Sequence, residues 1–156
     1  MSQTPSAGQL SRVVSQTLEE AAFVFAEAAA EPVQQRGDVV EGVLSFSGVQ
    51  SGSIVMLTSP AFAAELAANL LGVDPDDAEA LVRGKDAVGE MLNIIGGVLL
   101  EAWLGSHEAC MLEAPRVAER AAAEALEHHR AAAAAAVALL ADEEHPILAA
   151  LHVEAA

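Results

Sequence analysis

Residues 86–105 read DAVGEMLNIIGGVLLEAWLG, and the rest of the chain is best interpreted outward from this stretch. At about 100° per residue, with Asp86 at zero, its large apolar side chains fall on one arc between about 120° and 260°. An apolar face of this width is normally buried, so we predict a helix from Asp86 to Leu104 that ends at Gly105. The residues on this arc are Val88, Met91, Leu92, Ile95, Val98, Leu99, Ala102 and Trp103.

The opposite face of this helix carries Asp86, Glu90, Asn93 and Gly97, all between about −20° and 40°. A carboxylate and a carboxamide one turn apart project side by side and can enter another molecule's cleft together. The Asn93 amide accepts and donates hydrogen bonds without titrating, which suits it to positioning a water for attack on a phosphoryl group. Glu90 could pair with a lysine of the partner. Spacing alone, however, favours the ordinary solvated face of an amphipathic helix.

Upstream of this helix, the chain predicts a helix, a β-hairpin and a second helix. Small polar residues make residues 1–8 an expected disordered tail, so we place a single domain at residues 9–156. The second helix has Ser59 as its cap, proline in its first turn and Gly72 at its end. The acidic connector at residues 73–85 is expected to be a solvated loop with a short helical turn. The elements span 9–31 (helix), 39–47 and 53–58 (hairpin), and 61–71 (helix).

Downstream, the pattern predicts a strand within residues 107–114, which ends before Pro115. Residues 117–141 are so rich in alanine that intrinsic propensity alone predicts one long helix. The segment 135–153 also has two apolar arms around a polar turn, which is typical of a hairpin. We therefore expect a helix from Ala118 to His129 followed by a hairpin, with residues 131–141 open to either interpretation.

Composition excludes several classes of protein. The 156 residues carry 7 Lys and Arg against 23 Asp and Glu, a formal charge of -16, so we predict no affinity for nucleic acid. The longest uncharged apolar runs fall short of the roughly 18 residues that span a bilayer, and no secretory signal is visible, so we predict a cytoplasmic protein that binds no membrane. Cys110 stands alone, and the five histidines lack ligand spacing, so we expect no metal site.

One compound pattern in this sequence resembles a known family. Asp86-x-x-x-Glu90-x-x-Asn93 continues into Ile-Ile-Gly-Gly97, and Pro115 follows the asparagine after twenty-two positions. This pattern resembles the signature of the CheX, CheC and FliY chemotaxis phosphatases. The preceding block, residues 52–72, also resembles the strand and helix that precede the signature helix in that family, so the resemblance extends over roughly residues 10–153.

The resemblance implies an α/β (α+β) domain in which two long helices lie on a long antiparallel sheet. It implies docking onto a CheY-like receiver domain and hydrolysis of its aspartyl phosphate. Glu90 would form a salt bridge with the receiver's active-site lysine, Asn93 would orient the attacking water, and Asp86 would cap the helix. The Mg²⁺ would belong to the receiver, so the resemblance implies no cofactor on this chain.

Two features place the chain within that resemblance. CheC-like members carry two signature helices, whereas here Glu65 and Asn69 are spaced i and i+4, which indicates a degenerate or purely structural second copy. A single motif is closer to CheX and implies a homodimer. The alternative is a non-catalytic binding or scaffold module of the same fold, related to FliM. Loss of Glu90 or Asn93 would favour the scaffold. Because both residues are present, we expect a phosphatase. An unrelated helix-rich interaction domain would require the expected strands to be helical.

Overall fold

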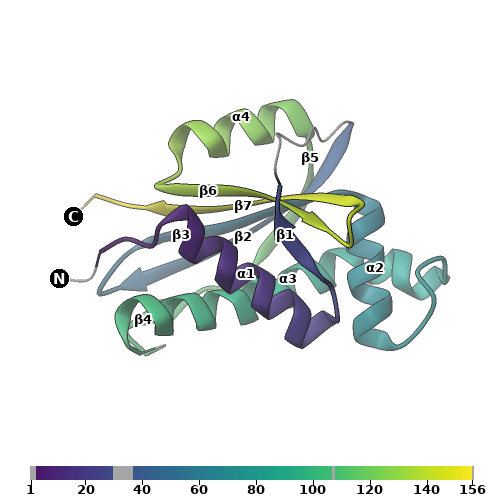
Figure 1. The fold of residues 1–156 in the computed structure, drawn as a ribbon, viewed down its shortest axis with the longest axis horizontal. Helices are drawn as coiled ribbons and strands as arrows, with labels where there is room; N and C mark the ends of the chain where they lie inside the picture. Colours follow the sequence, from purple (N-terminus) through teal and green to yellow (C-terminus); the bar gives the residue numbers. More distant parts are fainter. Residues whose placement is uncertain (1–2, 30–36, 107, 156) are drawn as a thin grey trace.

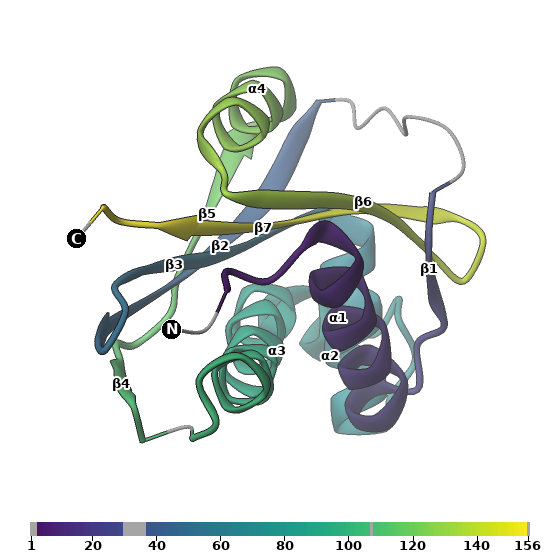
Figure 2. The same cartoon turned by 60° about the vertical axis from the view of Figure 1, so that its left-hand side comes forward.

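The computed structural model describes residues 3–29, 37–106 and 108–155. Within these ranges one antiparallel sheet of seven strands has α1, α2 and α3 on one face and α4 on the other (Figures 1 and 2). The expected α/β class and antiparallel sheet are therefore confirmed. The elements are α1 (Ala7–Ala22), β1 (Ala26–Ala28), β2 (Asp38–Gly48), β3 (Gly52–Thr58), α2 (Pro60–Leu71), α3 (Ala78–Leu104), β4 (Cys110–Leu112), β5 (Arg116–Ala121), α4 (Ala122–Ala132), β6 (Ala135–Ala141) and β7 (His145–Val153).

The sheet has the strand order β1-β6-β7-β3-β2-β4; β4 pairs with residues 46–48 of β2, and β5 pairs with residues 38–43 of the same strand. The predicted β2–β3 hairpin is confirmed, with Leu44 opposite Ile54 in its register. The C-terminal hairpin is also confirmed, because all of β6 pairs with residues 145–151 of β7. The alternative of one long helix over residues 117–141 is therefore wrong.

Helix α3 packs on the sheet through the predicted apolar arc. Leu92, Ile95 and Leu99 are almost completely buried. The helix lies close to β2 because two facing positions lack side chains. A Cβ added at Gly42 would lie 2.9 Å from Val88, and one added at Gly96 would collide with the Leu44 side chain. Burying large apolar side chains contributes about 1.5 to 3 kcal/mol each, which holds α3 rigidly.

The start of α3 differs from the prediction. The helix begins at Ala78, eight residues before Asp86, and includes most of the segment expected to be a loop. Asp77 is the N-cap, and its side chain accepts a hydrogen bond from the Glu79 amide. Asp86 is therefore in the body of the helix, not its cap, and pairs with Arg83 across one turn at 3.4 Å. The favourable cap at Asp77 explains why the helix starts about two turns earlier than predicted.

Helix α1 also differs at both ends. It begins at Ala7, because Ser6 and Gln9 form a reciprocal capping box, so these residues do not belong to a disordered tail. Residues 1–2, the start of that predicted tail, lie outside the described residues. The helix ends at Ala22, where Phe23 adopts a left-handed conformation (φ 57°), and the chain then forms β1, which was not predicted.

The segment after Pro115 forms a strand where a helix was expected. Residues 116–121 pair with residues 38–43 of β2, and only then does α4 begin, at Ala122. Hydrogen bonding to an available strand edge outweighs the helix propensity of alanine-rich sequence here. Helix α4 packs on the opposite sheet face through Ala122, Ala125 and Leu126.

By length and composition alone, α3 is apolar enough to cross a membrane. In this fold 56% of its most apolar window is buried. Most of its large apolar side chains therefore face the sheet and the neighbouring helices, as in the core helix of a globular domain, although Leu81, Val82 and Val98 are exposed.

Candidate functional site

The ridge predicted on α3 lies opposite its buried face. Asp86, Glu90 and Asn93 are exposed, and Gly97 is half-buried with no atom within 4 Å of the position that a Cβ would take. Within the described residues no hydrogen bond or ion pair engages the side chains of Glu90 or Asn93. Two polar groups one turn apart are thus presented to an incoming molecule by a helix that the core holds in place.

Pro115 lies beside this ridge although it is far along the chain. A hollow of about 450 Å³ is lined by residues of α3 and of the segment leading into β5. A Cβ built at Gly89 would lie 3.6 Å from both Pro115 and Val117, so the β5 segment contacts the helix at this point. The lining residues are Lys85, Asp86, Gly89, Glu90, Asn93, Pro115 and Val117. The hollow therefore brings together Asp86, Glu90, Asn93 and Pro115 of the sequence signature, whereas residues 94–97 of the signature do not line it.

A second hollow lies on the other side of Glu90, between α2 and α3. It measures about 320 Å³ and is mostly apolar on the α2 side. Asp86 and Glu90 line both hollows, whereas Asn93 lines only the one with Pro115. The residues of this second hollow are Ala67, Leu70, Leu71, Glu79, Arg83, Asp86, Ala87 and Glu90. The α2 residues could not be assigned to the site from sequence, because they come close only in the folded chain.

The second candidate pair, Glu65 and Asn69, is engaged within the fold. The Asn69 amide donates a hydrogen bond to the Ala22 carbonyl at the end of α1 (2.8 Å). Glu65 Oε2 lies 3.1 Å from His145 Nε2, at the start of β7. These side chains connect α2 to its neighbours, which matches the purely structural alternative for this pair.

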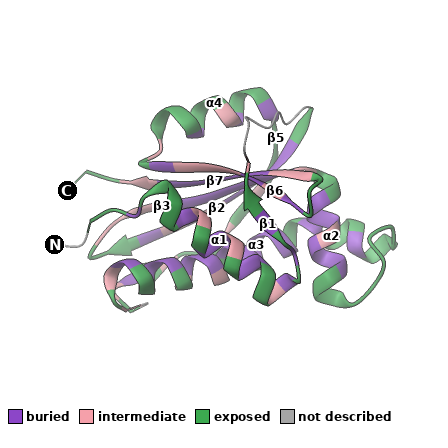
Figure 3. Cartoon of the chain, in the orientation of Figure 1, coloured by how far each residue is buried: buried purple, intermediate pink, exposed green. Residues whose placement is uncertain are grey.

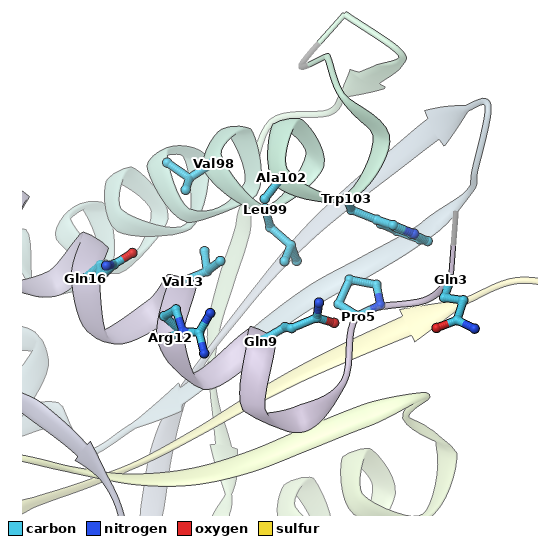
Figure 4. A pocket seen from close by; sticks show the side chains of 10 residues that line it. All are labelled: Gln3, Pro5, Gln9, Arg12, Val13, Gln16, Val98, Leu99, Ala102 and Trp103. Atoms are coloured by element: carbon cyan, nitrogen blue, oxygen red, sulfur yellow. The ribbon is translucent and has the colours of Figure 1, made fainter. Parts of the chain in front are cut away.

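The hollow between α1 and α3 is separate from the ridge. It measures about 480 Å³ and is lined by ten residues, six from the start of the chain and four from the end of α3 (Figure 4). Two of these, Val98 and Ala102, were expected to be buried but are exposed, because α1 does not cover that edge of α3. No residue of the Glu90 ridge lines this hollow.

A polar network lies on the opposite face of the sheet, under α4. Glu41, only 8% exposed, lies 2.7 Å from His129 Nε2 and accepts a hydrogen bond from Arg120 (3.2 Å). His129 Nδ1 in turn lies 2.9 Å from His152 Nε2. Burial, and then the neighbouring His129, lower the pKa of His152. Among the described residues, no three or more His, Cys, Asp or Glu side chains are arranged to hold a metal ion.

Solved structures share this fold. CheX from Desulfovibrio desulfuricans is 18% identical with a TM-score of 0.66, and the match covers 95% of this chain and 98% of that one. A CheX–CheY–BeF3–Mg complex from Borrelia burgdorferi is 14% identical with a TM-score of 0.68, covering 98% and 100%. FliM in its complex with SpeE from H. pylori is 13% identical with a TM-score of 0.51, covering 92% and 82%. At these identities the likeness establishes the fold shared by CheX and FliM-type proteins.

A family model then identifies the branch of this class. The model of chemotaxis phosphatase CheX matches residues 40–139. This chain belongs to the CheX family of chemotaxis phosphatases, which confirms the resemblance found in its sequence. Among curated protein sequences, none matches the chain.

Proposed function

We propose that this chain removes the phosphoryl group from the phosphorylated aspartate of a CheY-like receiver domain, and that Glu90 and Asn93 do so. The observation that carries the proposal is a pair of exposed side chains, one turn apart on a helix whose other face is buried, that have no hydrogen bond or ion pair among the described residues. Such a ridge can enter a partner's active site without rearrangement of the core. Membership of the CheX family supports the activity.

The two residues divide the work. Glu90 pairs with a lysine of the receiver and positions the ridge over the acyl phosphate. The Asn93 amide holds a water in line with the phosphorus, because it accepts from and donates to the same molecule. The water oxygen bonds to phosphorus as the bond to the aspartate oxygen breaks, which releases inorganic phosphate. A Mg²⁺ on the receiver would neutralise the developing charge, and this chain needs no cofactor of its own.

Two further observations support a receiver as the partner. The B. burgdorferi neighbour is a complex of CheX with CheY, BeF3 and Mg. The alternative, a non-catalytic scaffold like FliM, has a weaker structural likeness. We expect the protein to act in the cytoplasm and as a homodimer, and light scattering that gives the monomer mass at high concentration would contradict the dimer.

The test is a phosphate-release time course with CheY-like receivers of the same organism, phosphorylated with acetyl phosphate. Asn93→Ala should lose most of the hydrolysis yet still bind a receiver loaded with BeF3, because the contact it removes is made in the transition state. Glu90→Ala should weaken binding as well as turnover, and Glu90→Lys should weaken both further through like-charge repulsion. If Asn93→Ala releases phosphate as fast as wild type, the mechanism is wrong and the scaffold alternative takes its place.

A further inference from the structure

The hollow between α1 and α3 has the size and the lining of a small-molecule site. Its volume of about 480 Å³ falls within the range of about 300 to 1,000 Å³ that is typical of such sites. Arg12 and Trp103 lie at its two ends, with Val13 and Leu99 between them (Figure 4). Exposed residues run along both helices beside it, so a ligand can enter from solvent (Figure 3). None of the ten residues that line it is acidic, although the chain has 23 Asp and Glu, so the lining does not repel an anion.

Trp103 carries a buried hydrogen-bond donor without a partner. The residue is only 7% exposed, and its indole Nε1–H has no acceptor among the described residues. Phe46 of β2 contacts the indole edge to face, with ring centroids 6.1 Å apart, which holds the indole in place. A buried donor without an acceptor costs free energy, and native structures satisfy nearly all such groups. A ligand carbonyl at this end of the hollow would accept from Nε1 once the exposed Gln3 side chain beside it turns aside.

Arg12, at the other end of the hollow, is a cation without a counterion. Its side chain is half-buried on α1 and forms no ion pair or hydrogen bond with any described residue. The chain has 7 Lys and Arg against 23 Asp and Glu, so an arginine that no carboxylate contacts is unexpected here. A guanidinium binds a carboxylate through two parallel hydrogen bonds. A ligand carboxylate is therefore the group that this end would recognise.

We propose that this hollow binds a small organic acid that has an apolar body and a carbonyl group at its far end. The carboxylate pairs with Arg12, the apolar body packs on Val13 and Leu99, and the carbonyl accepts a hydrogen bond from Trp103 Nε1. No residue of the Glu90 ridge lines the hollow, so this inference does not rest on the phosphatase function.

Trp103 also provides the measurement. It is the only tryptophan and the chain has no tyrosine, so tryptophan emission reports on this hollow. The probes are the monomethyl esters of hexanedioic to decanedioic acid, which carry a carboxylate at one end and an ester carbonyl at the other. At least one of them should change the emission saturably. In competition with it, the dimethyl ester, which lacks the charge, should bind about tenfold more weakly, and the fatty acid of equal length, which lacks the carbonyl, about threefold more weakly.

Arg12→Gln tests the cation. It should weaken binding of the monomethyl ester about tenfold and leave binding of the dimethyl ester unchanged. Glutamine is a good helix former, so the thermal midpoint should change little. The matched control, Arg130→Gln, removes an exposed arginine of α4, on the opposite face of the sheet, and should change neither affinity.

A second variant keeps the test valid if Arg12→Gln fails to fold. Ala102 is exposed and lines the hollow, so Ala102→Glu places a carboxylate there and should weaken binding of the monomethyl ester by a similar factor. Three results would each overturn the proposal: no saturable change in emission with any monoester, equal binding of the monoester by wild type and both variants, or equal binding of the monoester and its matched fatty acid.

Discussion

Two adjacent glycines of α3 provide a sharp test of how this helix is placed. Gly96 faces the sheet, where a methyl group would collide with Leu44, whereas Gly97 faces outward with nothing within 4 Å. Replacement of a glycine within a helix by alanine stabilises by about 1 kcal/mol through backbone entropy, and both substitutions share this gain. Overpacking a core typically costs about 1 to 3 kcal/mol, and only Gly96→Ala incurs it, because Leu44 is fully buried.

Gly97→Ala should therefore raise the free energy of unfolding by about 0.5 to 1 kcal/mol. Gly96→Ala should lower it by up to about 2 kcal/mol, which leaves a difference of about 1 to 3 kcal/mol between the two variants. Urea titrations of both variants measure this difference, provided that their m-values agree with that of wild type. Equal stabilisation by the two substitutions would show that α3 does not lie as close to β2 as described.

Two other outcomes follow from the packing and from the network under α4. Leu99→Ala should cost about 2 to 5 kcal/mol in the same titration, and a change below about 1 kcal/mol would mean that the buried face of α3 is wrongly assigned. The lowered pKa of His152 means that the unfolded chain binds a proton more readily, so stability should fall as the pH drops below the ordinary histidine value of about 6.5. His152→Gln should reduce this loss, and His128→Gln should reduce it less, because His128 is the last and smallest of the causes that lower the His152 pKa; equal pH dependence in all three proteins would contradict the assignment.

Local signals were sufficient to predict some elements. The cap, proline and terminal glycine of α2, and the glycines and β-branched residues of the β2–β3 hairpin, specify those elements without help from distant residues. The face of α3 that carries Glu90 and Asn93 followed from periodicity alone. The catalytic roles of these two residues stay a prediction, because a helix face shows only which side chains are presented together.

Other features depend on contacts that no local pattern encodes. Strand β5 forms from alanine-rich sequence because the edge of β2 offers it hydrogen bonds, and β1 pairs with only three residues of β6. The start of α3 could not be predicted because the sequence offers several acidic residues as caps, and the structure uses Asp77 instead of Asp86. Glu41, His129 and His152 are far apart in the sequence and meet only when α4 crosses the sheet, so no ligand or network spacing was visible.

The alternation of side chains along β2 has a mechanical consequence. Glu41 points toward α4 and bonds its histidine network, whereas the next residue, Gly42, faces Val88 and Leu92 of α3. Successive residues of a strand are only about 3.3 Å apart, so a force applied to α4 reaches α3 through one peptide unit. The two faces of the sheet therefore share one backbone segment, so a substitution that shifts β2 at Glu41 would also alter the contact of Gly42 with the helix that carries Glu90.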